Sequence, residues 1–199
     1  MTSQECDTAR LCVAKVGGSL LELPDVAERL RRWLERAPRG VVLVAGGGEW
    51  VEAVRRADER FQLGEEAAHW LAADAMRTTA LLLHALLPDS GFADEWPLEH
   101  TTLHAQGTTI IDAWQFLRAD AAGAFGAPLP HSWQVTSDSI AARLARALGA
   151  MELVLLKSCD APADASPATL AECGLVDEYF PLAATRLNVR WVNLRAGVD

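Results

Sequence analysis

Short apolar runs alternate along the chain with longer segments in which apolar residues recur every three or four positions. Residues 11–16, 41–45 and 151–156 are apolar at nearly every position, a pattern typical of strands that are buried on both faces of a sheet. Residues 108–111 and 189–194 are two further candidate strands. Uninterrupted runs of this kind indicate a mostly parallel sheet, because a sheet with one solvated face would alternate apolar and polar residues.

The segments between these runs have helical periodicity. Helices are predicted over residues 24–37, 49–61, 65–87, 112–121 and 136–148. In the second of them, the predicted apolar stripe consists of Trp50, Val54, Ala57 and Phe61. The third is apolar around most of its circumference, so it is either a central helix or one that is covered by another subunit. Residues 89–107 are expected to be irregular.

Strands and helices therefore alternate, and glycine-rich turns join several of them. This order predicts an α/β protein in which helices cover both faces of a mostly parallel central sheet, a three-layer α/β/α sandwich. We find no internal repeat and no linker, so residues 1–199 are expected to form a single domain.

Composition and charge narrow the class of protein. The chain has 199 residues and a formal net charge of −9. A nucleic-acid partner is not expected, because neutralising the phosphates of a nucleic acid needs a basic face. No signal peptide and no run of 18 apolar residues is present, so we expect no membrane partner and a cytoplasmic protein. The four cysteines form no CxxC pair, which favours reduced thiols and no metal site.

Two glycine turns follow two of the predicted strands. The first consists of Gly17, Gly18 and Ser19, two residues after Lys15, and the second of Gly46, Gly47 and Gly48. A glycine turn before a helix exposes backbone N–H groups to an anion, and an ammonium group beside it adds a point charge. Tight packing would explain either turn alone. Neither matches GxGxxG or GxxxxGK[ST], so a dinucleotide-binding or P-loop protein is disfavoured.

The remaining lysine and one aspartate complete the candidate chemistry. The chain has sixteen arginines but only two lysines, Lys15 and Lys157, and Lys157 ends a predicted buried strand. Such a lysine needs an anion or a carboxylate, unless it reaches the surface. Asp138 follows Ser137 at the start of a predicted helix, where it would either cap the helix or orient a lysine toward a reacting phosphate.

Three other features are less informative. His69 lies on the long apolar helix, where it would either line a substrate pocket or occupy a position in the core or in an interface. His100 and His104 lack a third ligand nearby, so a metal site is not expected there. Residues 176–180 are acidic, which we interpret as solvated charge. The apolar surface of residues 65–87 favours a homo-oligomer, a dimer above all.

In this order, the motifs resemble those of the amino acid kinase family, which includes acetylglutamate, aspartate, glutamate 5- and uridylate kinases. The family's KxGGS motif matches Lys15 and residues 17–19, its second glycine turn matches residues 46–48, and its Asp-containing helix start matches Asp138. The resemblance covers nearly the whole chain and implies the amino acid kinase fold, which is similar to that of carbamate kinase. The short chain looks most like the small archaeal-type kinases of methanofuran biosynthesis, which act on an aminomethyl-furan-methyl phosphate. The segments that carry this closer resemblance are residues 65–76, with His69 and Trp70, residues 133–140 and residues 175–180.

The resemblance implies an ATP-dependent kinase that transfers the γ-phosphoryl group to a small acceptor, with Mg²⁺ carried on ATP. It makes residues 1–125 the acceptor-binding half and residues 126–199 the nucleotide-binding half. The implied catalytic residues are Lys15, Asp138 and Lys157. The residues implied in phosphate or substrate binding are Gly17, Gly18, Ser19, Gly46, Gly47, Gly48, His69 and Ser137. Those implied in nucleotide binding are Lys157, Ser158 and Asp160.

One departure from the family leaves alternatives open. Several relatives carry a catalytic lysine further along the nucleotide half, but no lysine follows Lys157 here. Either Lys157 takes that role, or an arginine such as Arg186 does, or the chain binds nucleotides or other anions without catalysis. A kinase for an amino acid carboxylate or a nucleoside monophosphate is a further alternative, because the fold does not determine the substrate.

Overall fold

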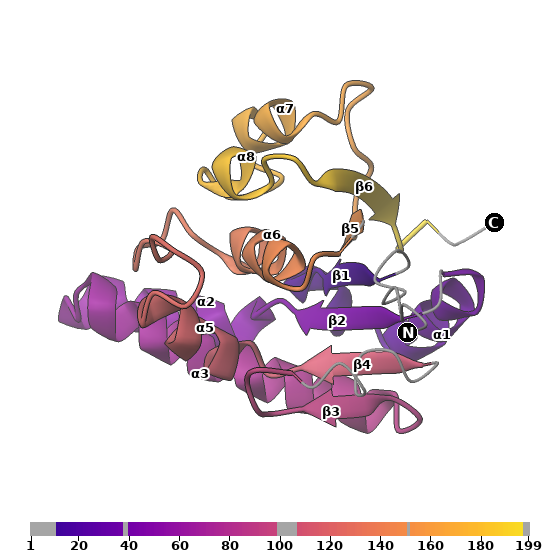
Figure 1. Ribbon diagram of the computed structural model, residues 1–199, viewed down its shortest axis with the longest axis horizontal. Coiled ribbons are helices and arrows are strands. Elements are labelled where there is room, and N and C mark those ends of the chain that lie inside the picture. Colours follow the sequence, from indigo (N-terminus) through magenta and orange to yellow (C-terminus); the bar gives the residue numbers. More distant parts are fainter. Residues whose placement is uncertain (1–10, 38–39, 99–106, 151, 197–199) are drawn as a thin grey trace, which may run out of the picture.

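The computed structural model describes residues 11–37, 40–98, 107–150 and 152–196. Its centre is one six-stranded sheet in the order β3-β4-β2-β1-β5-β6, and every neighbouring pair is parallel (Figure 1). The strands are β1 (Cys12–Val16), β2 (Val41–Ala45), β3 (Gly91–Ala93), β4 (Thr108–Ile111), β5 (Glu152–Lys157) and β6 (Asn188–Asn193). Because all strands point the same way, the turns that follow them meet at one edge of the sheet.

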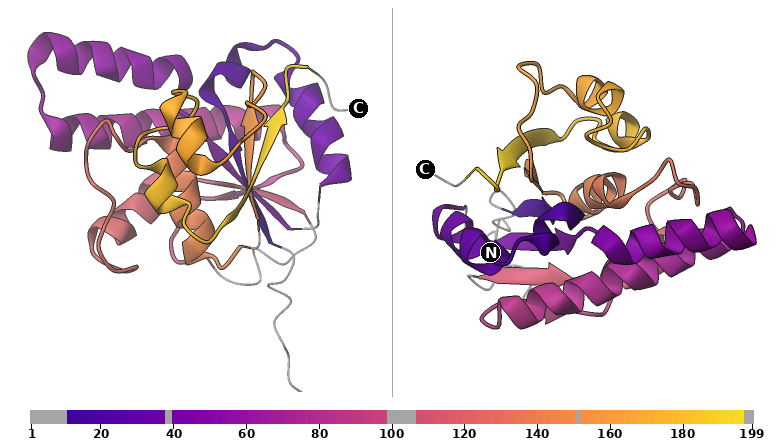
Figure 2. Two further views of the ribbon diagram at one scale, coloured as in Figure 1. Left: turned by 90° about the horizontal axis from the view of Figure 1, so that it is seen from above. Right: turned by 180° about the vertical axis from the view of Figure 1, so that it is seen from behind.

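Helices cover both faces of this sheet, so the predicted three-layer α/β/α architecture is confirmed (Figures 1 and 2). The helices are η2 (Gly18–Glu22), α1 (Val26–Arg36), α2 (Gly48–Phe61), α3 (Glu65–Leu86), α5 (Ala113–Ala121), α6 (Ser137–Ala147), α7 (Pro167–Glu172) and α8 (Phe180–Ala183). One layer contains α1 and the C-terminal part of α3, and the other contains α5, α6 and α8. Helices α2 and α3 lie side by side and project beyond the sheet (Figure 2).

The strands are buried on both faces, as their uninterrupted apolar sequences predict. In β1, Val13 packs into the layer of α6, whereas Cys12 and Ala14 pack into the layer of α1. All five residues of β1 and all five of β2 are buried, Lys15 among them. The polar end of Lys15 is therefore held inside the protein and needs a partner there.

Four elements differ from the sequence-based expectations. Strand β3 lies within residues 89–107, which were expected to be irregular, and the short α7 and α8 had no distinct signal. Helix α2 forms as predicted, but none of its residues is buried, so the predicted stripe does not face the core. Trp50 is 45% exposed and Phe61 is 67% exposed, because α2 packs on α3 beyond the end of the sheet.

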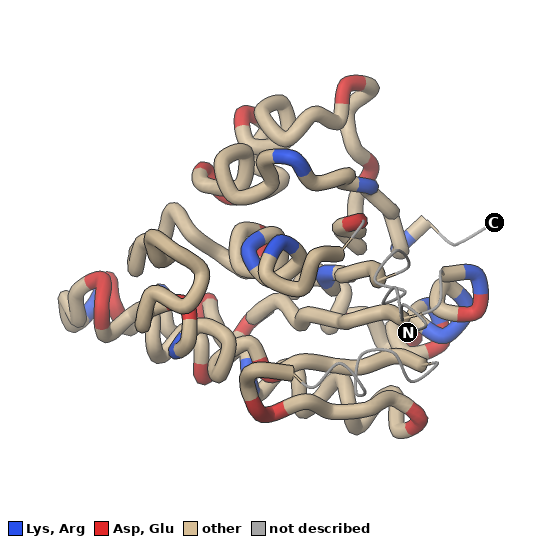
Figure 3. Tube along the Cα trace, in the orientation of Figure 1, with Lys and Arg blue, Asp and Glu red and all other residues tan. Residues whose placement is uncertain are grey.

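Charge is distributed unevenly over the surface. Acidic residues occur on most of the helices, and the basic residues gather most visibly on α1, which carries Arg29, Arg31, Arg32 and Arg36 (Figure 3). Within the described part of the chain, no helix is long and apolar enough to span a membrane. His100 and His104 lie outside the described residues, so the structure does not place them.

Candidate active site

The two lysines and the glycine turns meet where the central strands end. Lys15 is the fourth residue of β1, and Lys157 is the last residue of β5, the strand that pairs with β1. The turn that follows β1 lies beside the turn that follows β2. In parallel α/β sheets, ligands bind at this carboxyl edge.

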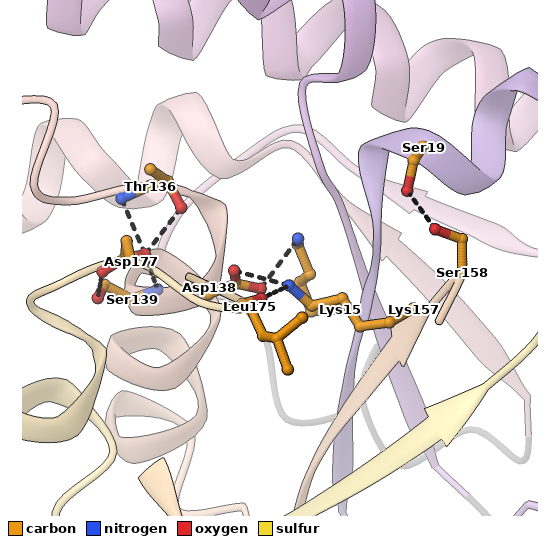
Figure 4. Close-up of polar contacts among 9 residues, drawn as sticks. All are labelled: Lys15, Ser19, Thr136, Asp138, Ser139, Lys157, Ser158, Leu175 and Asp177. Atoms are coloured by element: carbon orange, nitrogen blue, oxygen red, sulfur yellow. Dashed lines mark hydrogen bonds and ion pairs between the residues drawn. The ribbon is translucent and has the colours of Figure 1, made fainter. Parts of the chain in front are cut away.

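Asp138 joins the two lysines. One carboxylate oxygen, Oδ1, lies 2.9 Å from Nζ of Lys15, and the other, Oδ2, lies 2.9 Å from Nζ of Lys157 (Figure 4). Lys157 also donates a hydrogen bond of 2.8 Å to the carbonyl oxygen of Leu175. The side chains of Lys15 and Asp138 are only 5% and 6% exposed. Two ammonium groups are therefore held side by side by one buried carboxylate.

The charges of this cluster depend on one another. Burial alone would raise the pKa of Asp138, but the ammonium groups of Lys15 and Lys157 outweigh burial and lower that pKa, so the carboxylate stays ionised. Burial and the nearby Lys15 lower the pKa of Lys157 to about 8, against the opposing effect of Asp138. The cluster keeps one net positive charge when both lysines are protonated, and it has the sign that an anionic ligand needs.

The start of α6 is held by a carboxylate from a distant segment. Asp177 accepts hydrogen bonds from the backbone N–H of Thr136 at 3.0 Å and from that of Ser139 at 3.1 Å, and it also binds both hydroxyl groups (Figure 4). The interpretation of residues 176–180 as solvated charge was therefore wrong for Asp177, whose pKa burial raises. Thr136 is the N-cap residue, but its own side chain does not cap the helix. Asp177 thus fixes the turn that carries Asp138.

The two glycine turns are in direct backbone contact. A Cβ atom on Gly18 would lie 2.4 Å from the nitrogen of Gly48, and a Cβ on Gly46 would lie 2.8 Å from the nitrogen of Gly18. Gly48 itself has a φ of +53°, in the left-handed region that glycine adopts most easily. Side chains at these positions would force the turns apart, so the glycines are needed for packing whether or not an anion binds.

The expectation that all these glycines offer N–H groups to phosphate has to be corrected for two of them. The N–H of Gly17 donates to the carbonyl of Leu156 at 2.8 Å, and that of Gly46 donates to the carbonyl of Val16 at 2.8 Å. Gly18 begins η2 and Gly48 begins α2, where the first N–H groups have no acceptor within the helix. The donors that remain suited to an anion thus lie at the starts of these two helices.

The structure also places the remaining candidate residues relative to the glycine turns and to the ends of the strands. Ser19 and Ser158 join the first glycine turn to the end of β5 through hydroxyl groups 2.8 Å apart (Figure 4). Asp160 is exposed and accepts a hydrogen bond from Asn193 at 2.8 Å. Arg186 is exposed and precedes the start of β6, whereas Lys157 pairs with the end of that strand. Arg186 therefore lies at the opposite edge of the sheet and does not reach the lysine pair.

Three cavities lie around the glycine turns and the start of α6. One of about 460 Å³ lies along both glycine turns and is lined by Ser19, Gly47 and Ser137. A second, of about 580 Å³, is lined by Thr136, Asp138 and Leu175. A third, of about 60 Å³, shares Gly47 and Ser137 with the first and is also lined by His69. Open space thus lies along the glycine turns and beside Asp138, the residue that holds the two lysines.

The chain is similar to known proteins in sequence and in fold. The sequence model of the amino acid kinase family matches residues 10–169. A [5-(aminomethyl)furan-3-yl]methyl phosphate kinase from Methanocaldococcus jannaschii is 22% identical over 196 residues, which cover 92% of this chain and 88% of the relative.

Solved structures of uridylate kinases share the fold. The enzyme from Archaeoglobus fulgidus superposes with a TM-score of 0.61 at 18% identity, over 92% of this chain and 90% of that one. The UMP kinase from Bacillus anthracis superposes with a TM-score of 0.62 at 15% identity, over 93% of this chain and 87% of that one. At such low identity, the likeness shows the fold alone.

Proposed function

Because the chain belongs to the amino acid kinase family and is a phosphotransferase of that family, we propose that it transfers the γ-phosphoryl group of ATP to the phosphate of a small acceptor. The observation that carries this proposal is the pair of buried ammonium groups on Asp138, Lys15 on one oxygen and Lys157 on the other. Phosphoryl transfer needs little covalent chemistry from a protein, but it needs positive charge at a defined place.

The proposed step has a simple balance of bonds. An oxygen of the acceptor phosphate attacks the γ-phosphorus of ATP, the bond from that phosphorus to the β,γ-bridging oxygen breaks, and ADP leaves with the electron pair. The acceptor becomes a diphosphate. Lys15 and Lys157 neutralise charge on the transferring group, and Asp138 is the positioning residue that holds both lysines in place before the substrates arrive.

The surrounding residues fit two phosphorylated ligands. The start of α2, with Gly47 and Gly48, would bind phosphate on the side of residues 1–125, together with Ser19 and Ser137, which line the same cavity. Lys157, Ser158 and Asp160 would face the nucleotide on the side of residues 126–199. Mg²⁺ would be held mainly by phosphate oxygens and water, and it would supply further neutralisation of the phosphates.

The relative from Methanocaldococcus jannaschii suggests the class of acceptor. By its name, that enzyme phosphorylates [5-(aminomethyl)furan-3-yl]methyl phosphate, and this chain is similar to it along 92% of its length. We therefore propose a monophosphate ester of this kind as the acceptor.

The test is an assay of ADP release with ATP, Mg²⁺ and a panel of acceptors. The panel contains the aminomethyl-furan-methyl phosphate, UMP, aspartate and acetylglutamate, and we expect turnover with the furan phosphate. Lys157→Met should lower kcat by about 10²-fold or more while weakening ATP binding much less, since the lysine acts on charge that develops in the transition state.

Arg186→Met is the matched control, because Arg186 is an exposed cation at the opposite edge of the sheet. It should leave kcat at the wild-type value. Absence of ADP release with every acceptor would contradict a catalytic function and favour a binding protein. Equal kcat values for wild type and Lys157→Met would contradict the role of this lysine.

A further inference from the structure

The cavity of about 60 Å³ beside the glycine turns contains two polar atoms without partners. Nε2 of His69 and Oγ of Ser132 are both buried and have no hydrogen-bond partner among the described residues. The His69 residue as a whole is only 9% exposed. Buried polar atoms are nearly always paired, so two orphans that line one cavity point to a ligand that would satisfy both.

His69 is held rigidly and without charge. Its ring stacks on that of His131, with the centroids 4.0 Å apart and the planes at 9°. Nδ1 of His131 in turn lies 2.5 Å from a carboxylate oxygen of Glu66. Burial and the neighbouring His131 lower the pKa of His69 to about 4, so the imidazole is neutral near pH 7. In its Nε2–H tautomer, a neutral ring can donate one hydrogen bond to a ligand atom.

The size and lining of the cavity limit what it can hold. A single water needs on the order of 10–15 Å³ on the same scale, so about 60 Å³ suits a group of about five non-hydrogen atoms. Apart from the polar atoms, the lining is mainly apolar and includes Val51, Met76 and Ile140. A small planar ring with a polar atom fits such a space better than a chain of charged groups.

One carboxylate lines this cavity. Glu65, the first residue of α3, is exposed, and no hydrogen bond or ion pair engages it within the described part of the chain. Glu66 beside it is already engaged, by His131 and by Nε1 of Trp70 at 2.7 Å. Glu65 is therefore the carboxylate that a cationic ligand in the cavity would meet.

We infer that this cavity binds the ring of the acceptor, that the ring is a five-membered heteroaromatic one with a cationic amine, and that His69, Ser132 and Glu65 determine this specificity. The inference rests on the proposed function. His69 Nε2 donates to the ring heteroatom, Ser132 Oγ accepts from the amine, and Glu65 balances its charge. The cavity shares Gly47 and Ser137 with the larger cavity along the glycine turns, so the ester phosphate of a bound ring would extend toward those turns.

The test measures binding by calorimetry, with two probes and without turnover. The probes are [5-(aminomethyl)furan-3-yl]methyl phosphate and the analogue in which methyl replaces the aminomethyl group. Wild type should bind the amine about threefold more tightly or better, as one partly exposed ion pair allows. Glu65→Gln should reduce this ratio to about one, and Glu59→Gln, an exposed control on α2, should leave it unchanged.

His69→Phe keeps an aromatic ring on His131 but removes the donor. It should weaken both probes about tenfold, the effect of one lost hydrogen bond, and leave ATP binding as in wild type. If His69→Phe fails to fold, Ser132→Ala provides the same test, with the amine weakened more than its analogue. The inference would be overturned if these variants bound both probes as tightly as wild type does. It would also be overturned if wild type bound the amine and its methyl analogue equally well. Either result would mean that the cavity holds only solvent.

The failure of this inference is distinct from the failure of the proposed function. If the furan phosphate binds as described but no ADP is released, the proposed reaction is wrong and the ring site is correct. If ADP is released and the variants bind both probes as wild type does, the reaction is correct and the ring site is wrong.

Discussion

Lys157 combines two properties that are unusual for a lysine. Its ammonium group is held by Asp138 and by a backbone carbonyl, and it also lies 5.5 Å from the centre of the Trp191 ring. At the same time, burial and Lys15 lower its pKa to about 8, close to the pH at which enzymes are assayed. Its charge in the free protein is therefore sensitive to pH over a range where an ordinary lysine would be fully protonated.

This property predicts a pH dependence of catalysis. The protonated form exists below about pH 8 in the free enzyme, so kcat/KM for ATP should fall as pH rises through about 8. The phosphates of bound ATP favour the ammonium form, so the fall in kcat should occur at higher pH than the fall in kcat/KM. Initial rates of ADP release between pH 6 and 10 provide the measurement.

Lys157→Arg is the control for this profile, because arginine stays charged over the whole range. It should abolish the fall near pH 8, even where its absolute activity is low. A pH profile for Lys157→Arg like that of wild type would assign the pH dependence to another group.

The lowered pKa of Lys157 also affects stability, in the direction opposite to its effect on catalysis. Since the folded chain binds fewer protons than the unfolded chain between about pH 8 and 10.5, the free energy of unfolding should rise with pH there.

At the level of elements, the site depends on how closely two turns approach each other. Helices η2 and α2 begin at Gly18 and Gly48, and these two residues touch through their backbones. Atoms of the backbone cannot move aside as a flexible side chain can, so the contact leaves no space for a methyl group. The position of the first N–H groups of α2 relative to β1 is thereby determined by glycine.

Gly18→Ala should therefore damage the site more than an ordinary glycine replacement would. Its Cβ would lie 2.4 Å from the nitrogen of Gly48, whereas a Cβ on Gly91 at the sheet edge would have no neighbour closer than 3.6 Å. We expect Gly18→Ala to lower the free energy of unfolding by about 1–3 kcal/mol, as overpacking does, and to reduce kcat/KM by at least tenfold. Gly91→Ala should be close to wild type in urea unfolding and in the kinetic assay. Similar results for both variants would show that the turns separate easily.

The sequence was informative wherever the signal is local. The apolar runs predict β1, β2 and β5, and Lys15 and Lys157 are recognisable because lysine is otherwise absent. Asp138 at a helix start was equally visible, but its contact with both lysines depends on the pairing of β1 with β5, which no local pattern records.

Other features depend on contacts between distant segments. Asp177 caps α6 from about 40 residues away along the chain, and its acidic neighbours look like ordinary surface. Strand β3 has only three residues at the edge of the sheet, too few for a periodic pattern. The apolar stripe on α2 is present in the sequence. Periodicity shows only that one face of a helix is apolar, and it does not show which element or subunit packs against that face.

At the scale of the whole molecule, most of the exposed large apolar side chains lie on two neighbouring helices. Among the described residues, the exposed large apolar side chains are Trp50, Phe61, Leu71, Leu81 and Leu182, and the first four lie on α2 and α3. These two helices project beyond the sheet side by side (Figure 2). Exposed apolar side chains gathered on one part of a protein mark interaction sites more often than free surface. A second copy of the chain would cover both helices and would account for the apolar stripe of α2.

We therefore expect a homodimer that forms through α2 and α3. Light scattering coupled to gel filtration should give twice the chain mass at micromolar concentration. Phe61→Glu, which places a charge on the α2 face, should shift the protein to a monomer, because an unpaired charge buried in an interface costs several kcal/mol. Leu182→Glu is the matched control, since Leu182 is 60% exposed on α8, away from the projection, and this variant should remain a dimer (Figure 1). A monomeric wild type would contradict the predicted dimer. If Phe61→Glu stayed a dimer and Leu182→Glu became a monomer, the interface would lie on α8 instead.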